Sequence, residues 1–303
     1  MAGNSREMNG DLIRHHVTDA QISEDSFLYP LANFLNNIGQ EISFLPNWLS
    51  IPFSKHVAML WVAAIVTIGI SLWATRRYRT DKTAQPKGIA HIYELLLEFI
   101  KNDIIIPNIG IKDAKRWTPL AASFFIFILM CNFIGLIPFF EKLGGGGGAT
   151  PTGNFGVTLG LAAITFFAII IAGTLKHGFI GHWKNMIPSG VPAPVLIILI
   201  PIEIIGMFVK PFALTMRLGA NMTAGHIGMV AIFALPIILG NGTNVALGYS
   251  ENLYYPVGFF AGFIAVLLNT AIYGLEIIVC LVQAYVFTLL SAVFIGMAIH
   301  ADH

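Results

Sequence analysis

The chain has 303 residues, of which 56% are hydrophobic and 11% are charged, and its formal net charge is +1. Ordinary soluble domains carry about 25% charged residues, and several apolar runs here exceed the roughly 18 residues that a membrane helix needs. The composition therefore excludes an ordinary soluble enzyme. The sequence has no basic stripe that would indicate nucleic-acid binding. The two cysteines, Cys131 and Cys280, lie in apolar runs and predict neither a disulfide framework nor thiol chemistry.

The N-terminal segment, residues 1–55, is polar and acidic, and it lacks the basic and apolar regions of a cleavable signal peptide. The first membrane span is expected at about residues 57–75. Basic residues are concentrated directly after it, namely Arg76, Arg77, Arg79, Lys82 and Lys87. By the positive-inside rule, we expect residues 1–55 to form a non-cytoplasmic segment and residues 56–303 to form the membrane domain, with the C-terminus on the cytoplasmic side.

Residues 89–111 follow an amphipathic pattern, with apolar residues at helical spacing and with Glu94, Glu98 and Lys101 on other sides. This pattern favours a helix along the cytoplasmic membrane interface, and a short soluble hairpin is the alternative. Two more spans are expected at about residues 120–140 and 155–175.

The loop between those two spans contains a run of five glycines, 144–148, and the sequence Thr150-Pro151-Thr152-Gly153. No Gly-Lys-Ser/Thr follows and no strand precedes, so a nucleotide site is excluded and a flexible linker is expected. After the next span, His177 and His182 lie in a predicted loop. Two lone ligands favour solvated histidines over a metal site.

The last two apolar blocks, residues 194–239 and 256–299, are too long for simple spans. The first block would extend roughly 68 Å as a helix, which is more than twice the thickness of the hydrocarbon core. Each block must be two spans, a kinked helix or a strongly tilted helix, and hydropathy does not decide among these. Pro201, Pro211 and Pro236 supply kink points in the first block.

Three charged residues in the first of these blocks, Glu203, Lys210 and Arg217, are seven residues apart and so project from nearly the same helix face. A charge at the membrane centre costs from about 2.5 to more than 10 kcal/mol, so a regular set predicts a path for ions or protons. Because Arg217 keeps its proton, its natural role is that of a fixed positive charge. The alternatives are an internal ion pair between Arg217 and Glu276 and a snorkelling, structural role for Lys210.

Further polar residues accompany these charges. Asn221 lies one turn beyond Arg217, whereas His226 lies on roughly the opposite face and suits proton relay or a hydrogen-bonded core position. In the last block, Glu276 and Gln283 are seven residues apart on one face. If the two long helices pack together, these residues supply charge, donors and acceptors along one polar seam, which outlines a proton wire.

Three strings in the sequence resemble subunit a of F-type ATP synthases. They are KPFALTMRLGANMTAGHIGM, LEIIVCLVQAYVFTLLSAVF and the segment 131–138, which is similar to the family's Asn-x-x-x-Leu-x-Pro element. The resemblance covers most of the chain from about residue 57 onward. Together with the hydropathy it implies an all-α polytopic membrane protein with about five membrane helices and one interfacial amphipathic helix. The last two membrane helices would form a strongly tilted hairpin against a rotating ring.

The resemblance also implies residue roles. Arg217 would be the essential charge that faces the ring carboxylate. The outer half-channel would be lined by Asn132, Asn221, His226, Glu276 and Gln283, and the cytoplasmic half-channel by Glu203 and, more weakly, Lys210. Some relatives carry an acid at the position of His226 and a histidine at that of Glu276, so this chain has the reversed pair. Gly135 stands where certain bacterial relatives have an aspartate, so no relay is expected there.

The implied context is a bacterial inner-membrane ATP synthase in which this subunit is not catalytic by itself. The expected partners are a ring of small proteolipid subunits (subunit c), the peripheral-stalk subunit b and, indirectly, the soluble ATPase sector, with no cofactor and no metal. Protons are favoured over sodium because a hard cation prefers oxygen ligands. A secondary transporter is the main alternative, but no internal repeat supports it. An intramembrane metalloenzyme is disfavoured because no His-Glu-x-x-His spacing is present.

Overall fold

The computed structural model describes residues 55–80, 88–137, 150–185, 193–247 and 254–300, and all its regular elements in these ranges are helical. The long helices are α3 (Lys55–Thr80), α6 (Ile111–Leu136), α8 (Phe155–His177), α10 (Ala193–Leu247) and α11 (Tyr254–Ile299). The shorter elements are α4 (Ile89–Phe99), the π-helix η1 (Ile100–Ile105), α5 (Ile106–Ile109), the 3₁₀ turn η2 (Pro151–Gly153) and α9 (Phe179–Asn185). Within these ranges, five helices are long and apolar enough to cross a membrane. The predicted all-α membrane fold is confirmed.

The first three predicted spans agree with α3, α6 and α8. Helix α6 begins earlier than predicted because the basic residues at its start are already helical, and it continues through Pro119. Residues 89–109 form one uninterrupted helical stretch of α4, η1 and α5, so the hairpin alternative is wrong. This stretch ends at Gly110, whose φ of 90° is a left-handed conformation that favours glycine. The position of the stretch at a membrane interface stays a prediction.

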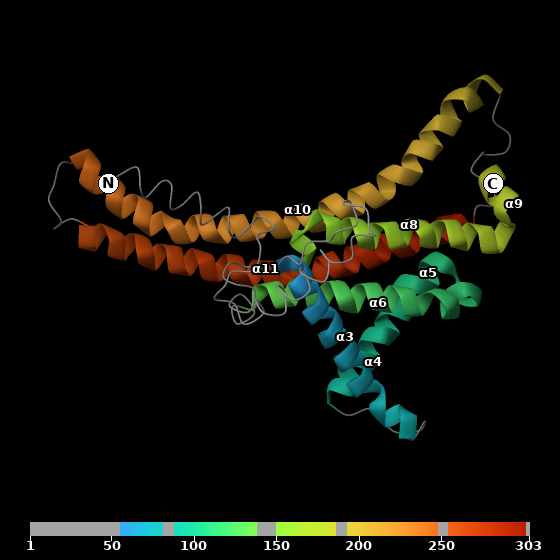
Figure 1. Ribbon diagram of the computed structural model, residues 1–303, viewed down its shortest axis with the longest axis horizontal. Helices are drawn as coiled ribbons and strands as arrows, with labels where there is room; N and C mark the ends of the chain where they lie inside the picture. The colour runs from blue at the N-terminus through green and yellow to red at the C-terminus, as the bar shows by residue number, and fades with distance from the viewer. Residues whose placement is uncertain (1–54, 81–87, 138–149, 186–192, 248–253, 301–303) are drawn as a thin grey trace, which may run out of the picture. The chain divides into compact units, whose positions relative to one another are not determined.

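The two long apolar blocks are single helices rather than pairs of spans. Helix α10 has 55 residues and α11 has 46 residues, and Figure 1 draws each as an uninterrupted ribbon. Pro201, Pro211 and Pro236, the predicted kink points, each remove one backbone donor without ending α10, which is tolerated where neighbouring helices support it.

The chain divides into two compact units, and α10 and α11 contribute to both. The first unit comprises Met1–Leu60, Asn132–Gly153 and Ala220–Leu281. The second unit comprises Trp61–Cys131, Asn154–Gly219 and Val282–His303. Each unit contains one part of the candidate site, and each is described by itself below.

Within the first unit, α10 and α11 run antiparallel. Met222 and Cys280 belong to one buried apolar cluster, while Gly225 lies against Glu276. Residues that come later in α10 therefore contact residues that come earlier in α11, as the antiparallel arrangement requires. The end of α6 joins this pair, since the Tyr273 hydroxyl donates to the Leu136 carbonyl at 2.7 Å.

The second unit has the same antiparallel arrangement of α10 and α11. Gln283 hydrogen-bonds the backbone of Arg217, and Lys210 lies over the ring of Phe294. The predicted hairpin of the last two helices is thus confirmed in each unit, whereas its tilt in a bilayer stays a prediction.

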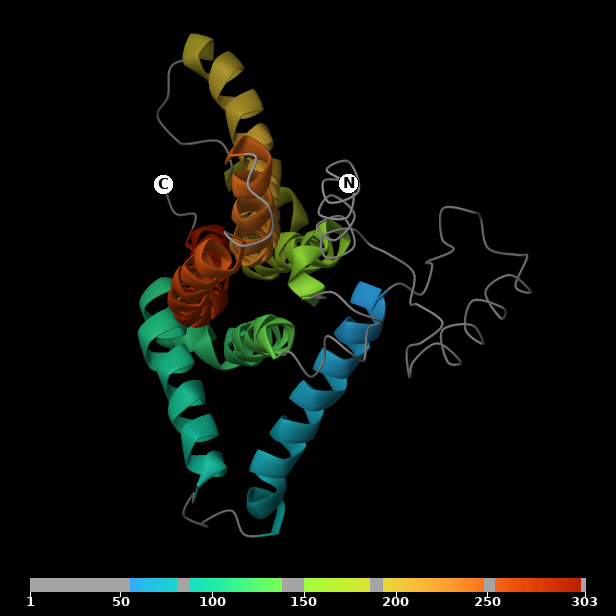
Figure 2. The ribbon, with the colours of Figure 1, turned by 90° about the vertical axis from the view of Figure 1, so that its left-hand side faces the viewer.

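Helices α3 and α4 of the second unit meet at one end and diverge from it (Figure 2). At the meeting point the Tyr78 hydroxyl donates to Glu94 at 2.9 Å, and the Tyr93 hydroxyl donates to Ser71 at 3.1 Å. The polar contacts of this pair are therefore concentrated where the chain passes from one helix to the other.

The ends of α5, α8 and α11 come together in the second unit. The His300 ring bonds the Ile109 carbonyl at 2.8 Å, and the His177 ring bonds the Ile299 carbonyl at 3.0 Å. A Cβ at Gly296 would collide with the Asn108 carbonyl oxygen, so only glycine permits this approach. The prediction of a solvated His177 is wrong, because α8 continues through this residue and carries its half-buried ring to the end of α11.

Candidate functional site

Arg217 and Gln283 are brought together in the second unit. Gln283 is 4% exposed, and its Nε2 donates to the backbone oxygen of Arg217 at 2.5 Å. A side-chain amide from α11 therefore fixes the α10 backbone at Arg217. Sequence spacing alone did not predict this contact, because it joins residues 66 positions apart.

The Arg217 side chain is exposed, and it stands on an apolar helix face. Leu214 and Leu218 are buried at 2% and 1% exposure, so this stretch of α10 turns its leucines inward. Ala213 and Ala220, which lie four residues before and three residues after Arg217 on the same helix face, are exposed as Arg217 is. The result is a positive charge on a surface that is otherwise suited to lipid or to another apolar partner.

Lys210 is a weaker candidate for a polar path. Its ammonium group is half-buried and lies 5.5 Å from the centroid of the Phe294 ring. A cation over an aromatic face is stabilised by the ring quadrupole, which favours the structural alternative for this residue. Glu203 belongs to the same helix, but its side chain lies outside the described part of the structure.

Glu276 is the buried acid of the first unit. It is 4% exposed, and neither carboxyl oxygen has a hydrogen-bond partner among the residues that the structure describes. A Cβ on Gly225 would lie 2.7 Å from Glu276 Oε1, so the carboxyl group rests on the bare backbone of α10. An unpaired buried polar group typically lowers the stability of the fold by about 1–3 kcal/mol. Unpaired buried groups are therefore rare, and those that occur are frequent at functional sites.

Asn132 lies in a polar cluster of the same unit. It is 1% exposed, and its Oδ1 accepts a hydrogen bond from the Thr152 hydroxyl at 2.6 Å. Its Nδ2 donates to the Cys280 carbonyl at 3.4 Å, one helical turn beyond Glu276. Two residues predicted for the outer half-channel, Asn132 and Glu276, are thus held on neighbouring turns of α6 and α11.

The other two predicted members of this group lie on α10. Asn221 is exposed and makes an interaction of its own. The side chain of His226 lies outside the described part of the structure, and so does that of His182 on α9. The pairing of His226 with Glu276 stays a prediction.

The prediction of a flexible linker is wrong for residues 150–153. Thr150, Pro151 and Thr152 are buried, and η2 is closed by a bond from the Gly153 amide to the Thr150 carbonyl at 2.9 Å. The turn fits because Gly135 lacks a side chain, since a Cβ there would collide with the Thr150 hydroxyl. The glycine run 144–148 lies outside the described residues.

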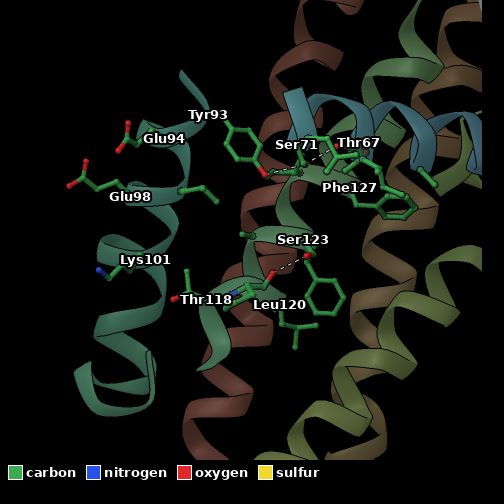
Figure 3. A pocket seen from close by; sticks show the side chains of 18 of the residues that line it. Thr67, Ser71, Tyr93, Glu94, Glu98, Lys101, Thr118, Leu120, Ser123 and Phe127 are labelled. Atoms are coloured by element: carbon green, nitrogen blue, oxygen red, sulfur yellow. Dashed lines mark hydrogen bonds between the residues drawn. The ribbon is translucent and has the colours of Figure 1, made fainter. Parts of the chain in front are cut away.

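A large cavity in the second unit is separate from all these residues. Its volume is about 1040 Å³, and it is lined by side chains of α3, α4, η1, α6 and α8. Figure 3 shows Tyr93 pointing toward Ser71, and Glu94, Glu98 and Lys101 are the charged residues of the lining. None of the predicted site residues lines it.

Comparisons with known proteins agree on one family. A family profile described as "ATP synthase A chain" matches residues 57–296. The protein "ATP synthase subunit a 2" of Chlorobaculum tepidum is 39% identical over 304 residues, which cover 99% of this chain and 76% of that protein. "ATP synthase subunit a 2" of Prosthecochloris aestuarii is 38% identical, with 100% of this chain and 83% of that protein covered. "ATP synthase subunit a" of Anaeromyxobacter dehalogenans is 36% identical, with coverages of 99% and 74%.

Proposed function

We propose, because the chain belongs to the ATP synthase A chain family, that it is the proton-translocating stator subunit of a rotary F-type ATP synthase. It is a multi-pass membrane protein with five long apolar helices in its described residues. Under this proposal the subunit is not catalytic by itself. It couples proton flow to rotation of a proteolipid ring, while the soluble sector carries out the phosphate chemistry.

The observation that carries the proposal is the environment of Arg217. Its side chain is exposed on a helix face that it shares with the exposed Ala213 and Ala220, and Gln283 fixes its backbone. A cation on an apolar, membrane-facing surface is costly unless it meets a counter-charge. A mobile carboxylate on a second, otherwise apolar protein surface supplies that counter-charge without bringing water into the membrane.

The mechanism follows from the response of a carboxyl group to its surroundings. A ring carboxyl that faces lipid stays protonated, because desolvation disfavours its charged form. When it reaches Arg217, the fixed positive charge favours ionisation, and the proton leaves through one half-channel. After it has passed Arg217, the carboxylate is reprotonated from the other half-channel. The same arginine repels protons and so prevents a direct leak between the two paths.

The outer half-channel is proposed to comprise Asn132, Asn221, His226, Glu276 and Gln283. The burial of Asn132 and Glu276 in one polar region of the first unit supports this assignment. The cytoplasmic half-channel is proposed to comprise Glu203, with Lys210 as a weaker member because its ammonium is engaged by Phe294. Gln283 acts at least partly by holding the Arg217 backbone.

The proposed partners are the ring of subunit c, the peripheral-stalk subunit b and, indirectly, the soluble ATPase sector. The proposed location is a bacterial inner membrane, with residues 1–55 on the non-cytoplasmic side and the C-terminus in the cytoplasm. The excess of basic residues after the first span supports this orientation.

The experiment that tests the function compares wild type with Arg217→Ala in inverted membrane vesicles that contain the whole complex. ATP-driven proton pumping, ATP hydrolysis and the amount of assembled complex are measured together. We expect Arg217→Ala to abolish pumping while the complex assembles. Arg116→Ala, at an exposed arginine of α6, is the matched control and should pump normally. Undiminished pumping by Arg217→Ala would mean that the arginine is a structural ion pair, and it would overturn the proposed mechanism.

A further inference from the structure

The turn η2 carries a hydroxyl group that no proton-path assignment above includes. Thr152 is fully buried, and its Oγ1 donates to Asn132 Oδ1 at 2.6 Å. Other buried threonines, such as Thr215 and Thr288, donate to the carbonyl four residues earlier in their own helix. Such bonds satisfy the hydroxyl locally. Thr152 instead bonds a side chain on a different element.

The turn is fixed in position from two sides within the first unit. The Thr150 side chain fills the space that Gly135 leaves open on α6. On the other side, the Thr223 hydroxyl of α10 donates to the Gly153 carbonyl at 3.4 Å. Thr152 therefore reaches Asn132 from a backbone that both neighbouring helices hold in place.

The bond from Thr152 determines how the Asn132 amide is oriented. A hydroxyl that donates to Oδ1 requires the oxygen of the amide to face η2, so Nδ2 faces α11. There Nδ2 donates to the Cys280 carbonyl at 3.4 Å. An amide nitrogen carries two donor hydrogens, and this bond uses one of them. Glu276 precedes Cys280 by about one turn on the same helix.

Glu276 needs a polar neighbour if it exchanges protons. Its carboxyl group is 4% exposed and has no hydrogen-bond partner among the described residues. Proton transfer requires donors and acceptors within hydrogen-bond reach, directly or through one water. The oriented Asn132 amide is a polar group on the neighbouring helix at the adjacent turn.

We propose that Thr152 is a positioning residue of the outer half-channel, which holds the Asn132 amide toward the Glu276 turn of α11. This inference rests on the proposed function. It predicts that removal of the hydroxyl changes how the pumping rate depends on pH, and not only how much complex assembles. The titratable groups near Asn132 and Glu276 are Tyr273, Glu276 and Cys280 of α11 and Cys131 of α6. His226 of α10 follows Gly225, and its side chain lies outside the described part of the structure.

The test uses the whole complex in inverted vesicles and two substitutions of one residue. Thr152→Val keeps the shape but removes the hydroxyl, whereas Thr152→Ser keeps the hydroxyl. Thr288→Val is the matched control. Among the described residues, the buried Thr288 hydroxyl bonds only to the Ala284 carbonyl of its own helix. ATP-driven pumping is recorded across a range of pH values, together with ATP hydrolysis and complex assembly.

We expect Thr152→Val to pump about 3- to 10-fold more slowly, as loss of one buried hydrogen bond implies, with a displaced pH profile. Thr152→Ser and Thr288→Val should behave like wild type. An unchanged pH profile in Thr152→Val, or equal slowing by both Thr152 variants, would mean that η2 is only structural. If Thr152→Val does not assemble, Asn132→Asp is measured instead. An acid at that position should shift the pH profile of pumping, and an unshifted profile overturns the inference.

Arg217→Ala in the same vesicles separates the two proposals. If it still pumps, the proposed mechanism at Arg217 fails, whereas the positioning role of Thr152 is decided separately by the pH profile of Thr152→Val. If Arg217→Ala does not pump while Thr152→Val matches wild type at every pH, only the role of Thr152 is lost.

Discussion

The charged residue at the centre of each unit has an opposite environment in the two units. In the second unit Arg217 is exposed on an apolar face, and a buried amide from Gln283 fixes its backbone. In the first unit Glu276 is buried, and its carboxyl oxygens have no partner among the described residues. The fixed charge faces outward and the titratable acid faces inward.

This difference corresponds to two physical tasks. A group that stabilises a charge on another molecule must be held rigidly at a surface, because preorganisation avoids reorganisation at each encounter. A group that passes protons along must instead be able to exist in both protonation states, whereas a permanent positive partner would favour only the charged form. The contrast predicts that substitutions in the first unit alter proton delivery, while those in the second alter coupling.

The largest expected effect in the first unit comes from Glu276→Gln. The amide preserves the size of the side chain but cannot exchange a proton, so we expect proton pumping to fall at least about tenfold while the complex assembles. Pumping in inverted vesicles is the measurement, and Glu276→Asp should restore part of the rate. Glu98→Gln, at an exposed acid of α4, is the control. Normal pumping by Glu276→Gln would remove this acid from the proton path.

A smaller effect is expected from Gln283→Leu in the second unit. This substitution removes the donor to the Arg217 carbonyl and leaves the guanidinium group present, so we expect about 3- to 10-fold slower pumping from the loss of one buried hydrogen bond. Because the charge is less rigidly placed, the ratio of protons pumped to ATP hydrolysed should fall as well.

Ser291→Ala is the appropriate comparison for Gln283→Leu, since it removes another buried polar group of α11 that bonds Thr165 and its own helix. A loss of coupling in Ser291→Ala as large as in Gln283→Leu would show that general packing, and not the position of Arg217, is what matters.

Sequence reasoning identified the helices well because the membrane imposes strong constraints. A span needs about 20 apolar residues, and the predicted spans accordingly overlap α3, α6 and α8, although α6 begins and ends earlier than predicted. Hydropathy did not decide whether residues 194–239 form one helix or two, since a proline can either end a helix or be accommodated in it. That outcome depends on packing partners elsewhere in the chain.

The candidate site was predictable only in part, for a related reason. Arg217 and Glu276 stand out because charges are rare in apolar segments. Thr152 does not stand out, because its burial depends on Gly135 and Thr223, which lie in distant segments. His177 was misjudged in the same way, since its ring bonds the far end of α11. Contacts of this kind carry no local signal in the sequence.

The smallest effect, and the one that most sharply probes the first unit, is expected from Gly225→Ala. The added methyl group would lie 2.7 Å from Glu276 Oε1, so the carboxyl group must move, although its flexible side chain permits this. We expect pumping to fall by about twofold to fivefold with normal assembly, since the flexible carboxyl side chain can shift and the cost stays at the low end for overpacking, about 1 kcal/mol.

Gly228→Ala is the matched control for Gly225→Ala, because a Cβ at that position of α10 meets no described atom within 4 Å. In a helix interior, alanine is itself more favourable than glycine, so both variants gain the same local stability and differ only in the contact with Glu276. A loss of pumping restricted to Gly225→Ala therefore assigns the effect to the position of the carboxyl group. Equal rates in the two variants would mean that proton delivery does not depend on how Glu276 rests against α10.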